Sequence, residues 1–75
     1  MPLVQISVIE GALTPEQKSQ LVGNVTEAVL SVYGEGLRPY TWVIVQDVKS
    51  GQWGIGGQSI TAEAVRGLMT APATG

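Results

Sequence analysis

Apolar and polar residues alternate near the start of the chain. Residues 3–10 read Leu-Val-Gln-Ile-Ser-Val-Ile-Glu, with branched apolar side chains at every second position from residue 4. A period of two is typical of a β-strand that buries one face, so the sequence predicts a strand over 3–10. Leu3 and Ile9 make the second face of this strand partly apolar as well.

The pattern then changes to a helical period. Residues 14–17 read Thr-Pro-Glu-Gln, which is a capping box with a proline at the first helical position. Apolar residues recur three or four positions apart as far as residue 33, and glycines at 34 and 36 end the pattern. We predict a helix over about 15–33. Gly23 in its middle is interpreted as a point of close approach to the sheet.

Three shorter elements are predicted after this helix. Residues 40–48 form a second strand, so continuously apolar that burial on both faces is indicated. The glycine-rich stretch 50–57 predicts a turn or short hairpin, and 61 to about 69 a brief helix with Thr61 as its cap. The tail from residue 70 is expected to fray.

The order of these elements indicates one α/β domain over residues 1–75. A strand-helix-strand unit of this size forms a parallel pair with a right-handed crossover, here followed by a short C-terminal hairpin. One helix can cover only one face of the pair, and both strands keep an unpaired edge. We therefore expect the chain to assemble into an oligomer that supplies the missing cover.

The amino-acid composition excludes several classes of catalytic group, metal site and binding partner. Cysteine and histidine are both absent, which excludes disulfides, thiolate nucleophiles, Ser-His triads and the usual zinc sites. The net charge of -2 without a basic stripe argues against nucleic acid as a partner. The sequence also predicts no membrane span and no signal peptide, so a cytoplasmic location is expected. An acid or base here must be a carboxylate, lysine, tyrosine or terminal amine.

Pro2 is the first candidate for such a group. Removal of the initiator methionine would turn its nitrogen into a secondary amine, and desolvation of that amine would lower its pKa toward neutrality. A rigid prolyl amine in an apolar pocket is therefore a candidate general base. The alternative is that proline is simply a common second residue.

Three further residues are candidates for binding. Trp53, within Gln52-Trp53-Gly54-Ile55-Gly56-Gly57, either walls a pocket or anchors packing between chains. Arg38 either reaches a substrate carboxylate or is a solvated loop residue. Trp42 in the second predicted strand is most often a core or interface residue. The carboxylates are scattered singly, so the carboxylate pair of a glycosidase is not supported.

Taken together, these residues resemble the 4-oxalocrotonate tautomerase family. The resemblance is carried over roughly residues 2–60 by Pro2, the helix start at 14–18, and Trp53-Gly54-Ile55-Gly56-Gly57. It implies a β-α-β subunit assembled as a homohexamer, a trimer of dimers. It also implies an N-terminal proline that acts as general base on a small enol or 2-keto acid without cofactor or metal, and an aromatic residue at Trp53 that lines the proline pocket.

The sequence departs from this family where arginines are expected. The stretch Gly11-Ala12-Leu13 is uncharged, and Trp42 stands where the second strand usually carries an arginine. Arg38 is the nearby substitute for binding a substrate carboxylate, and a small, rather apolar keto-enol acid suits a site walled by Trp42, Trp53 and Leu37. Two alternatives stay open: a hydratase, dehalogenase or decarboxylase that uses a protonated proline, and a non-catalytic oligomeric scaffold or binding module.

Overall fold

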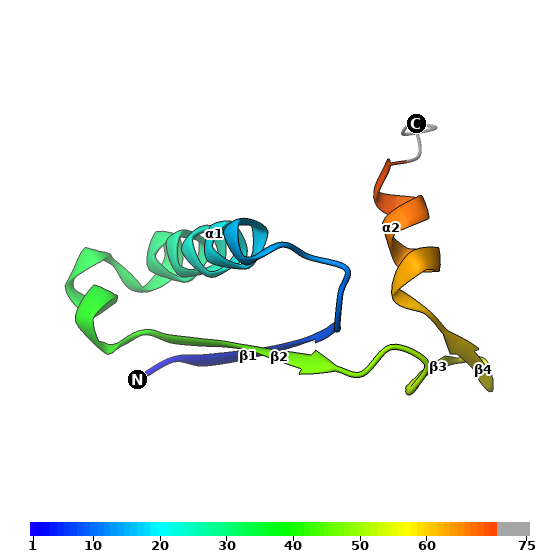
Figure 1. The fold of residues 1–75 in the computed structure, drawn as a ribbon. Helices are drawn as coiled ribbons and strands as arrows, with labels where there is room; N and C mark the ends of the chain where they lie inside the picture. The colour runs from blue at the N-terminus through cyan, green and yellow to red at the C-terminus, as the bar shows by residue number, and fades with distance from the viewer. Residues whose placement is uncertain (71–75) are drawn as a thin grey trace. The chain divides into compact units, whose positions relative to one another are not determined.

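A computed structural model describes residues 1–70 of the chain (Figure 1). The elements in chain order are β1 (Leu3–Ile9), α1 (Pro15–Tyr33), the 3-10 helix η1 (Glu35–Tyr40), β2 (Trp42–Val48), β3 (Trp53–Ile55), β4 (Gln58–Ile60) and α2 (Ala62–Thr70). They divide into two compact units. The first unit contains 1–7 and 13–46, and the second contains 8–12 and 47–70. Thr70 is the last residue of α2 and 71–75 lie outside the described residues, so the expectation of a frayed tail stays a prediction.

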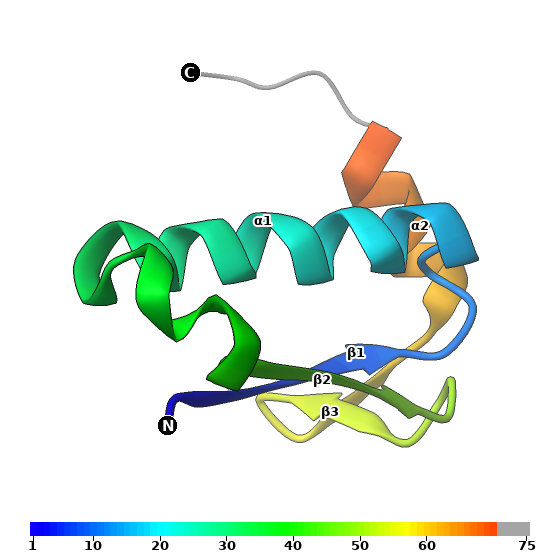
Figure 2. The same ribbon diagram turned by 90° about the vertical axis from the view of Figure 1, so that its left-hand side faces the viewer.

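The chain forms a β-α-β unit in which β1 and β2 pair in parallel. At the start of the pair the Trp42 amide donates to the Pro2 carbonyl at 3.0 Å, and at its end the Glu10 amide donates to the Val48 carbonyl at 2.7 Å. The beginning of β1 therefore pairs with the beginning of β2, and the end of β1 with the end of β2. This parallel arrangement is what a crossover through α1 requires. Within the first unit, α1 runs along one face of the two strands (Figure 2). The predicted fold class is confirmed.

Alternation in β1 is confirmed by its exposure. Side chains of β1 are exposed at Leu3, Gln5 and Ser7 and half-buried at the positions between them. The strand therefore shows one face to α1 and leaves the other without cover from its own unit. No side chain of β2 is fully buried within this chain, because a single helix covers a single face.

The start of α1 is built as the sequence predicts. The Gln17 amide donates to the Thr14 hydroxyl at 3.2 Å, and the Thr14 amide donates to the Gln17 side-chain oxygen at 2.9 Å. This capping box satisfies two of the donors that a helix leaves unpaired at its N-terminus. It fixes where α1 begins, directly after the loop that follows β1.

The interpretation of Gly23 is wrong. A β-carbon built at this position has no neighbour within 4 Å, so no close approach to the sheet requires a glycine. The residue is exposed on α1. Its cost is therefore the conformational entropy that any glycine loses inside a helix.

Replacing Gly23 by alanine is expected to stabilise the protein. The space is open and the backbone helical, so Gly23→Ala should raise the free energy of unfolding by about 0.5–1 kcal/mol. Urea denaturation at a fixed protein concentration measures this, with the exposed Ser19→Ala on the same helix as control. A lower free energy of unfolding for Gly23→Ala would mean that another copy packs closely over this part of α1.

The second predicted strand begins two residues late. Tyr40 belongs to η1, and β2 begins at Trp42. The Thr41 amide donates to the Arg38 carbonyl, and the Thr41 hydroxyl donates to the Leu37 carbonyl at 2.8 Å. These bonds continue the turn through residue 40, so that Trp42 is the first residue free to join the ladder.

The second unit holds a separate hairpin and α2. β3 and β4 are antiparallel, with Trp53 opposite Ile60. The two residues that join them, Gly56 and Gly57, have φ of 59° and 84°, the left-handed conformations that a two-residue hairpin turn demands. α2 is capped by Thr61 as predicted, since the Thr61 hydroxyl accepts from the Ala64 amide at 3.3 Å. Arg66 of α2 donates to the Gly11 carbonyl.

Residues 1–70 bury little of their apolar surface within a single chain. Its fully buried hydrophobic residues are Ile9, Ala12, Leu30 and Ala62. Exposed large ones include Met1, Leu3 and Trp42, where the β1–β2 pair begins. Such surface is what the sequence predicts for a subunit that completes its core against other copies. None of the helices in residues 1–70 has the length and apolar character needed to cross a membrane.

Candidate active site

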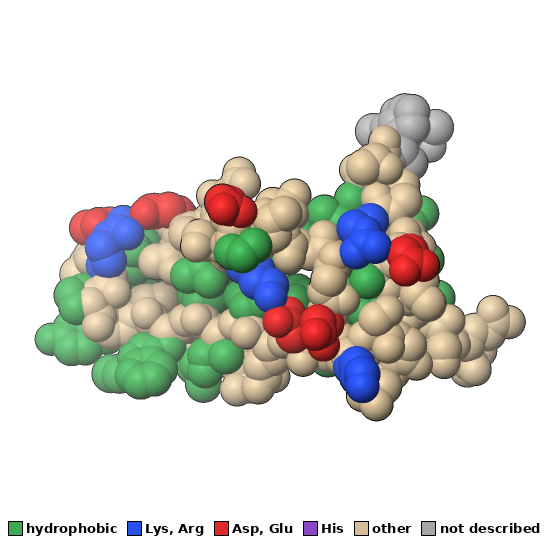
Figure 3. All heavy atoms as spheres, in the orientation of Figure 1, with side chains coloured by type: hydrophobic (Ala, Val, Ile, Leu, Met, Phe, Trp, Pro, Cys, Tyr) green, Lys and Arg blue, Asp and Glu red, His purple; other side chains and the backbone are tan. Residues whose placement is uncertain are grey.

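Pro2 and Trp42 meet at the beginning of the β1–β2 pair. Together with Met1 and Leu3 they line a hollow of about 200 Å³. Pro2 is half-buried there, and the indole of Trp42 is 58% exposed at the rim. In Figure 3 hydrophobic side chains gather along this edge of the first unit. The structure therefore brings together Pro2 and Trp42, two candidate site residues that lie forty positions apart in the sequence.

The lining of this hollow decides its chemistry. All four side chains are apolar, and the hydrogen bond between the Trp42 amide and the Pro2 carbonyl holds the proline against the neighbouring strand. An apolar surrounding disfavours the charged form of an amine and so favours a nitrogen able to accept a proton. A secondary amine at Pro2 would sit in such a surrounding.

Arg38 lies in η1 and is engaged by two carboxylates. Its guanidinium forms ion pairs with Glu27 of α1 at 2.8 Å and with Glu35 of η1 at 2.5 Å. The hydrogen bond from Arg38 lowers the pKa of Glu35, and the hydrogen bonds to Glu35 and then Glu27 raise the pKa of Arg38 above its usual value. Glu35 and Arg38 are therefore both charged at neutral pH.

The remaining nominated residues lie elsewhere. Leu37 is half-buried in η1, where its amide donates to the Gly34 carbonyl at 3.2 Å. Trp53 is half-buried at the start of β3, opposite Ile60, in the second unit. The role of Trp53 as a wall of the Pro2 pocket stays a prediction.

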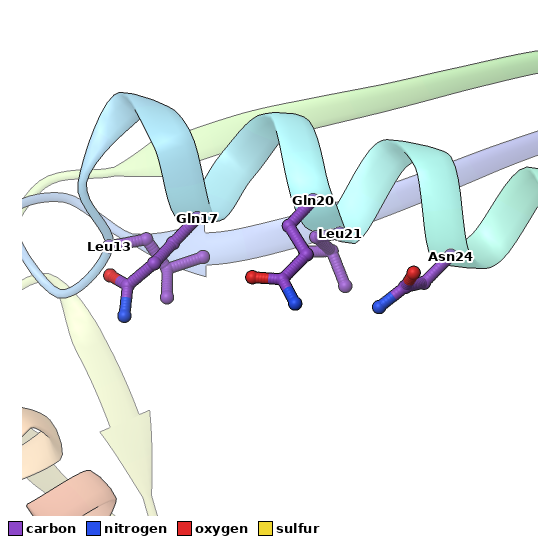
Figure 4. Close-up of a pocket in the computed structure, with 5 residues that line it drawn as sticks. All are labelled: Leu13, Gln17, Gln20, Leu21 and Asn24. Carbon is purple, nitrogen blue, oxygen red and sulfur yellow. The ribbon is translucent and has the colours of Figure 1, made fainter.

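A second hollow lies on α1, with a volume of about 240 Å³. Figure 4 shows its lining side chains projecting to the same side of the helix: Leu13, Gln17, Gln20, Leu21 and Asn24. Its polar groups are amides, which do not act as acids or bases near neutral pH. The Gln17 oxygen is also occupied by the capping box. This hollow is therefore not a candidate for acid-base chemistry.

Residues 1–70 contain no cluster of three or more His, Cys, Asp or Glu side chains that could hold a metal ion. Two carboxylates do meet, at Arg38, although they lie eight positions apart in the sequence. The expectation that the carboxylates are scattered singly is wrong at this point. The guanidinium between them makes this an ion-pair cluster and not a ligand set.

Comparison with known proteins identifies the family. The profile of the family described as "Tautomerase enzyme" matches residues 2–63. The chain belongs to the tautomerase family. A probable tautomerase of Dickeya dadantii is 39% identical over 61 residues, which cover 81% of this chain and 90% of the relative. The family named from the motifs at Pro2, residues 14–18 and Trp53 is therefore confirmed.

Solved tautomerase structures support the same family assignment. A 4-oxalocrotonate tautomerase isozyme from Methylibium petroleiphilum is 38% identical with a TM-score of 0.69, covering 85% of this chain and 97% of its own. A heterohexameric 4-oxalocrotonate tautomerase from Chloroflexus aurantiacus is 28% identical with a TM-score of 0.72, covering 80% of this chain and 94% of its own. The chain is therefore a member of the 4-oxalocrotonate tautomerase family in sequence and fold.

The ion-pair cluster is the feature that sequence reasoning missed. Glu35 and Arg38 are three residues apart, which is the spacing of neighbours on a helical turn. That signal was present but lay among Gly34, Gly36 and Pro39, which are typical of loops. Only the fold shows that Glu27 of α1 also reaches the same guanidinium.

Proposed function

We propose that this tautomerase interconverts the keto and enol forms of a small enol or 2-keto acid, with the amine of Pro2 as general base. The reaction moves a proton from one carbon or hydroxyl of the substrate to another position of the same molecule. Pro2 takes the proton and returns it, so atoms balance without a cofactor or metal. The family membership supports the reaction class.

The observation that carries the proposal is the hollow around Pro2. Pro2 lies half-buried among Met1, Leu3 and Trp42, at the start of a strand whose neighbour holds it in place. Loss of Met1 would free the nitrogen and remove one wall of the hollow at the same time. The amine would then face an opening whose remaining walls are Leu3 and Trp42.

Trp42, Leu37, Trp53 and Arg38 complete the proposed binding site. The indole of Trp42 offers an apolar wall for the carbon chain of the substrate. We propose that Leu37 and Trp53 also contact this carbon chain. Arg38 is assigned to the substrate carboxylate, whether in its own subunit or in a neighbouring one. A bidentate guanidinium suits a carboxylate better than a lysine would.

The working form is proposed to be a hexamer of identical chains built as a trimer of dimers. The exposure of Leu3 and Trp42 at the start of the sheet supports assembly, because an isolated chain leaves this apolar surface in water. The hexameric relative from Chloroflexus aurantiacus supports the number of copies.

The proposal is tested by comparing two forms of the protein that differ only at Met1. The form that begins at Pro2, verified by intact mass, should ketonise a dienol such as a 2-hydroxydienoate, followed by the loss of its ultraviolet absorbance. The form that retains Met1 has an amide nitrogen at Pro2, which is not a base, and should fall to the rate of the uncatalysed reaction. Equal rates for the two forms would contradict a role for the Pro2 amine. An absence of turnover of any enol by the processed form would favour a binding module.

A further inference from the structure

The cluster at Arg38 carries more negative than positive charge. One guanidinium is paired with two carboxylates, Glu27 from the last part of α1 and Glu35 from the beginning of η1. The hydrogen bonds at 3.1 Å from Arg38 Nη2 to Glu27 Oε2 and Glu35 Oε2 join the two acids through one nitrogen. The formal charges of one guanidinium and two carboxylates sum to -1.

This charge arrangement belongs to a single chain. Glu27, Glu35 and Arg38 all lie within the first unit, so an assembly that brings Arg38 to a site also brings its two carboxylates. The other arginine of the sequence, Arg66, lies in the second unit and donates to the Gly11 carbonyl. The guanidinium nearest in sequence to Trp42 is therefore already occupied.

The cluster is also close enough to influence the Pro2 hollow. Arg38 precedes Trp42 by four residues, which limits the separation of their Cα atoms to about 14 Å. Figure 3 shows acidic and basic side chains gathered over the end of α1 and η1, on the same unit as the hydrophobic edge. Because these charges are exposed, their effect on the specificity is expected to be a few-fold and to decrease with salt.

We infer that Glu27 and Glu35 set the charge specificity of the site: they occupy Arg38 and leave a negative cluster, so that the substrate is an enol acid with a single carboxylate and an apolar remainder. This inference rests on the proposed function and names its substrate class. A dicarboxylate brings a second negative charge to the negative cluster, and this adds a repulsion that a monocarboxylate does not meet. A monocarboxylate needs only to exchange with one glutamate at the guanidinium.

The test compares two six-carbon acids, adipate with two carboxylates and hexanoate with one, by calorimetric titration of the processed protein. We expect the wild-type protein to prefer hexanoate. Each of Glu27→Gln and Glu35→Gln should raise the affinity for adipate relative to hexanoate by about two- to fivefold, the size of an exposed ion-pair effect. The shift should shrink when the salt concentration is raised to 0.5 M. The same ratio is then measured as kcat/KM with a dicarboxylate and a monocarboxylate dienol.

Glu16→Gln is the matched control. It is the same chemical change on the same helix, eleven residues before Glu27 and therefore roughly 16 Å away along the axis of α1. Its ratio should equal that of the wild-type protein. Circular dichroism of each variant confirms that α1 is intact.

The outcomes separate this inference from the proposed function. The inference would be overturned if the affinity for adipate relative to hexanoate did not change in either glutamine variant, or if it changed equally in Glu16→Gln. This holds even if the processed protein turns over enols. A salt-sensitive shift in the binding ratio, together with no turnover by the processed protein, would support the charge assignment and contradict the tautomerase reaction.

Discussion

Replacing Pro2 by alanine is expected to lower kcat/KM for enol ketonisation by about 10²-fold or more. A positioned general base contributes roughly 10²–10⁴-fold to a rate. The alanine variant keeps a terminal amine after loss of Met1, so the loss should lie toward the lower end of that range. It arises because a primary amine on a flexible end is not held against Trp42 as the prolyl ring is.

The control for this variant is Ser19→Ala, an exposed change on α1 that touches none of the site residues. Intact mass must show that Met1 is absent from all three proteins, and size-exclusion chromatography must show the same oligomer. Pro2→Ala with wild-type kcat/KM, in a verified Pro2-free and Met1-free chain, would remove Pro2 from the mechanism.

Leu30→Ala is expected to be the most destabilising single change in α1. Leu30 is 5% exposed, and its carbonyl accepts the Gly34 amide that closes the helix at 2.8 Å. Deleting a buried leucine side chain loses its transfer free energy and leaves a cavity, which costs about 2–5 kcal/mol. That is a large fraction of the stability of a 75-residue domain.

Val32→Ala, two residues later on the same helix, is the matched control. Val32 is 85% exposed, so its truncation should change the free energy of unfolding by no more than about 0.5 kcal/mol. Both variants are unfolded in urea at one fixed protein concentration, because the stability of an oligomer depends on concentration. Equal effects of the two changes would mean that Val32 is buried as well, against its own sheet or against another copy.

Local sequence signals predicted most of the fold because each is satisfied by residues close together in the chain. The capping box needs only Thr14 and Gln17, and the hairpin turn needs only two glycines with positive φ. The period-two pattern of β1 survives because one face packs and the other does not. Parallel pairing follows from the length of the crossover.

Features that depend on contacts between distant parts of the chain could not be predicted from local sequence signals. The 3-10 helix η1 was missed because its glycines and proline have the composition of a loop, and its bonds become visible only in three dimensions. The cluster at Arg38 depends on Glu27, eleven residues earlier, meeting the end of η1. The chemistry of a terminal amine and the family resemblance pointed to Pro2 from the sequence, whereas the position of Trp42 beside it is set by the register of β1 and β2.

The most direct test of this account is the titration of the Pro2 nitrogen, followed by nitrogen-15 NMR in protein that begins at Pro2. We expect the pKa of this amine to lie below the roughly 7.7–8.0 of an ordinary α-amino group, because the apolar hollow disfavours its charged form. The pH profile of kcat/KM should rise through the same value. A pKa well above 8 would contradict the general-base role and point to chemistry that uses a protonated proline.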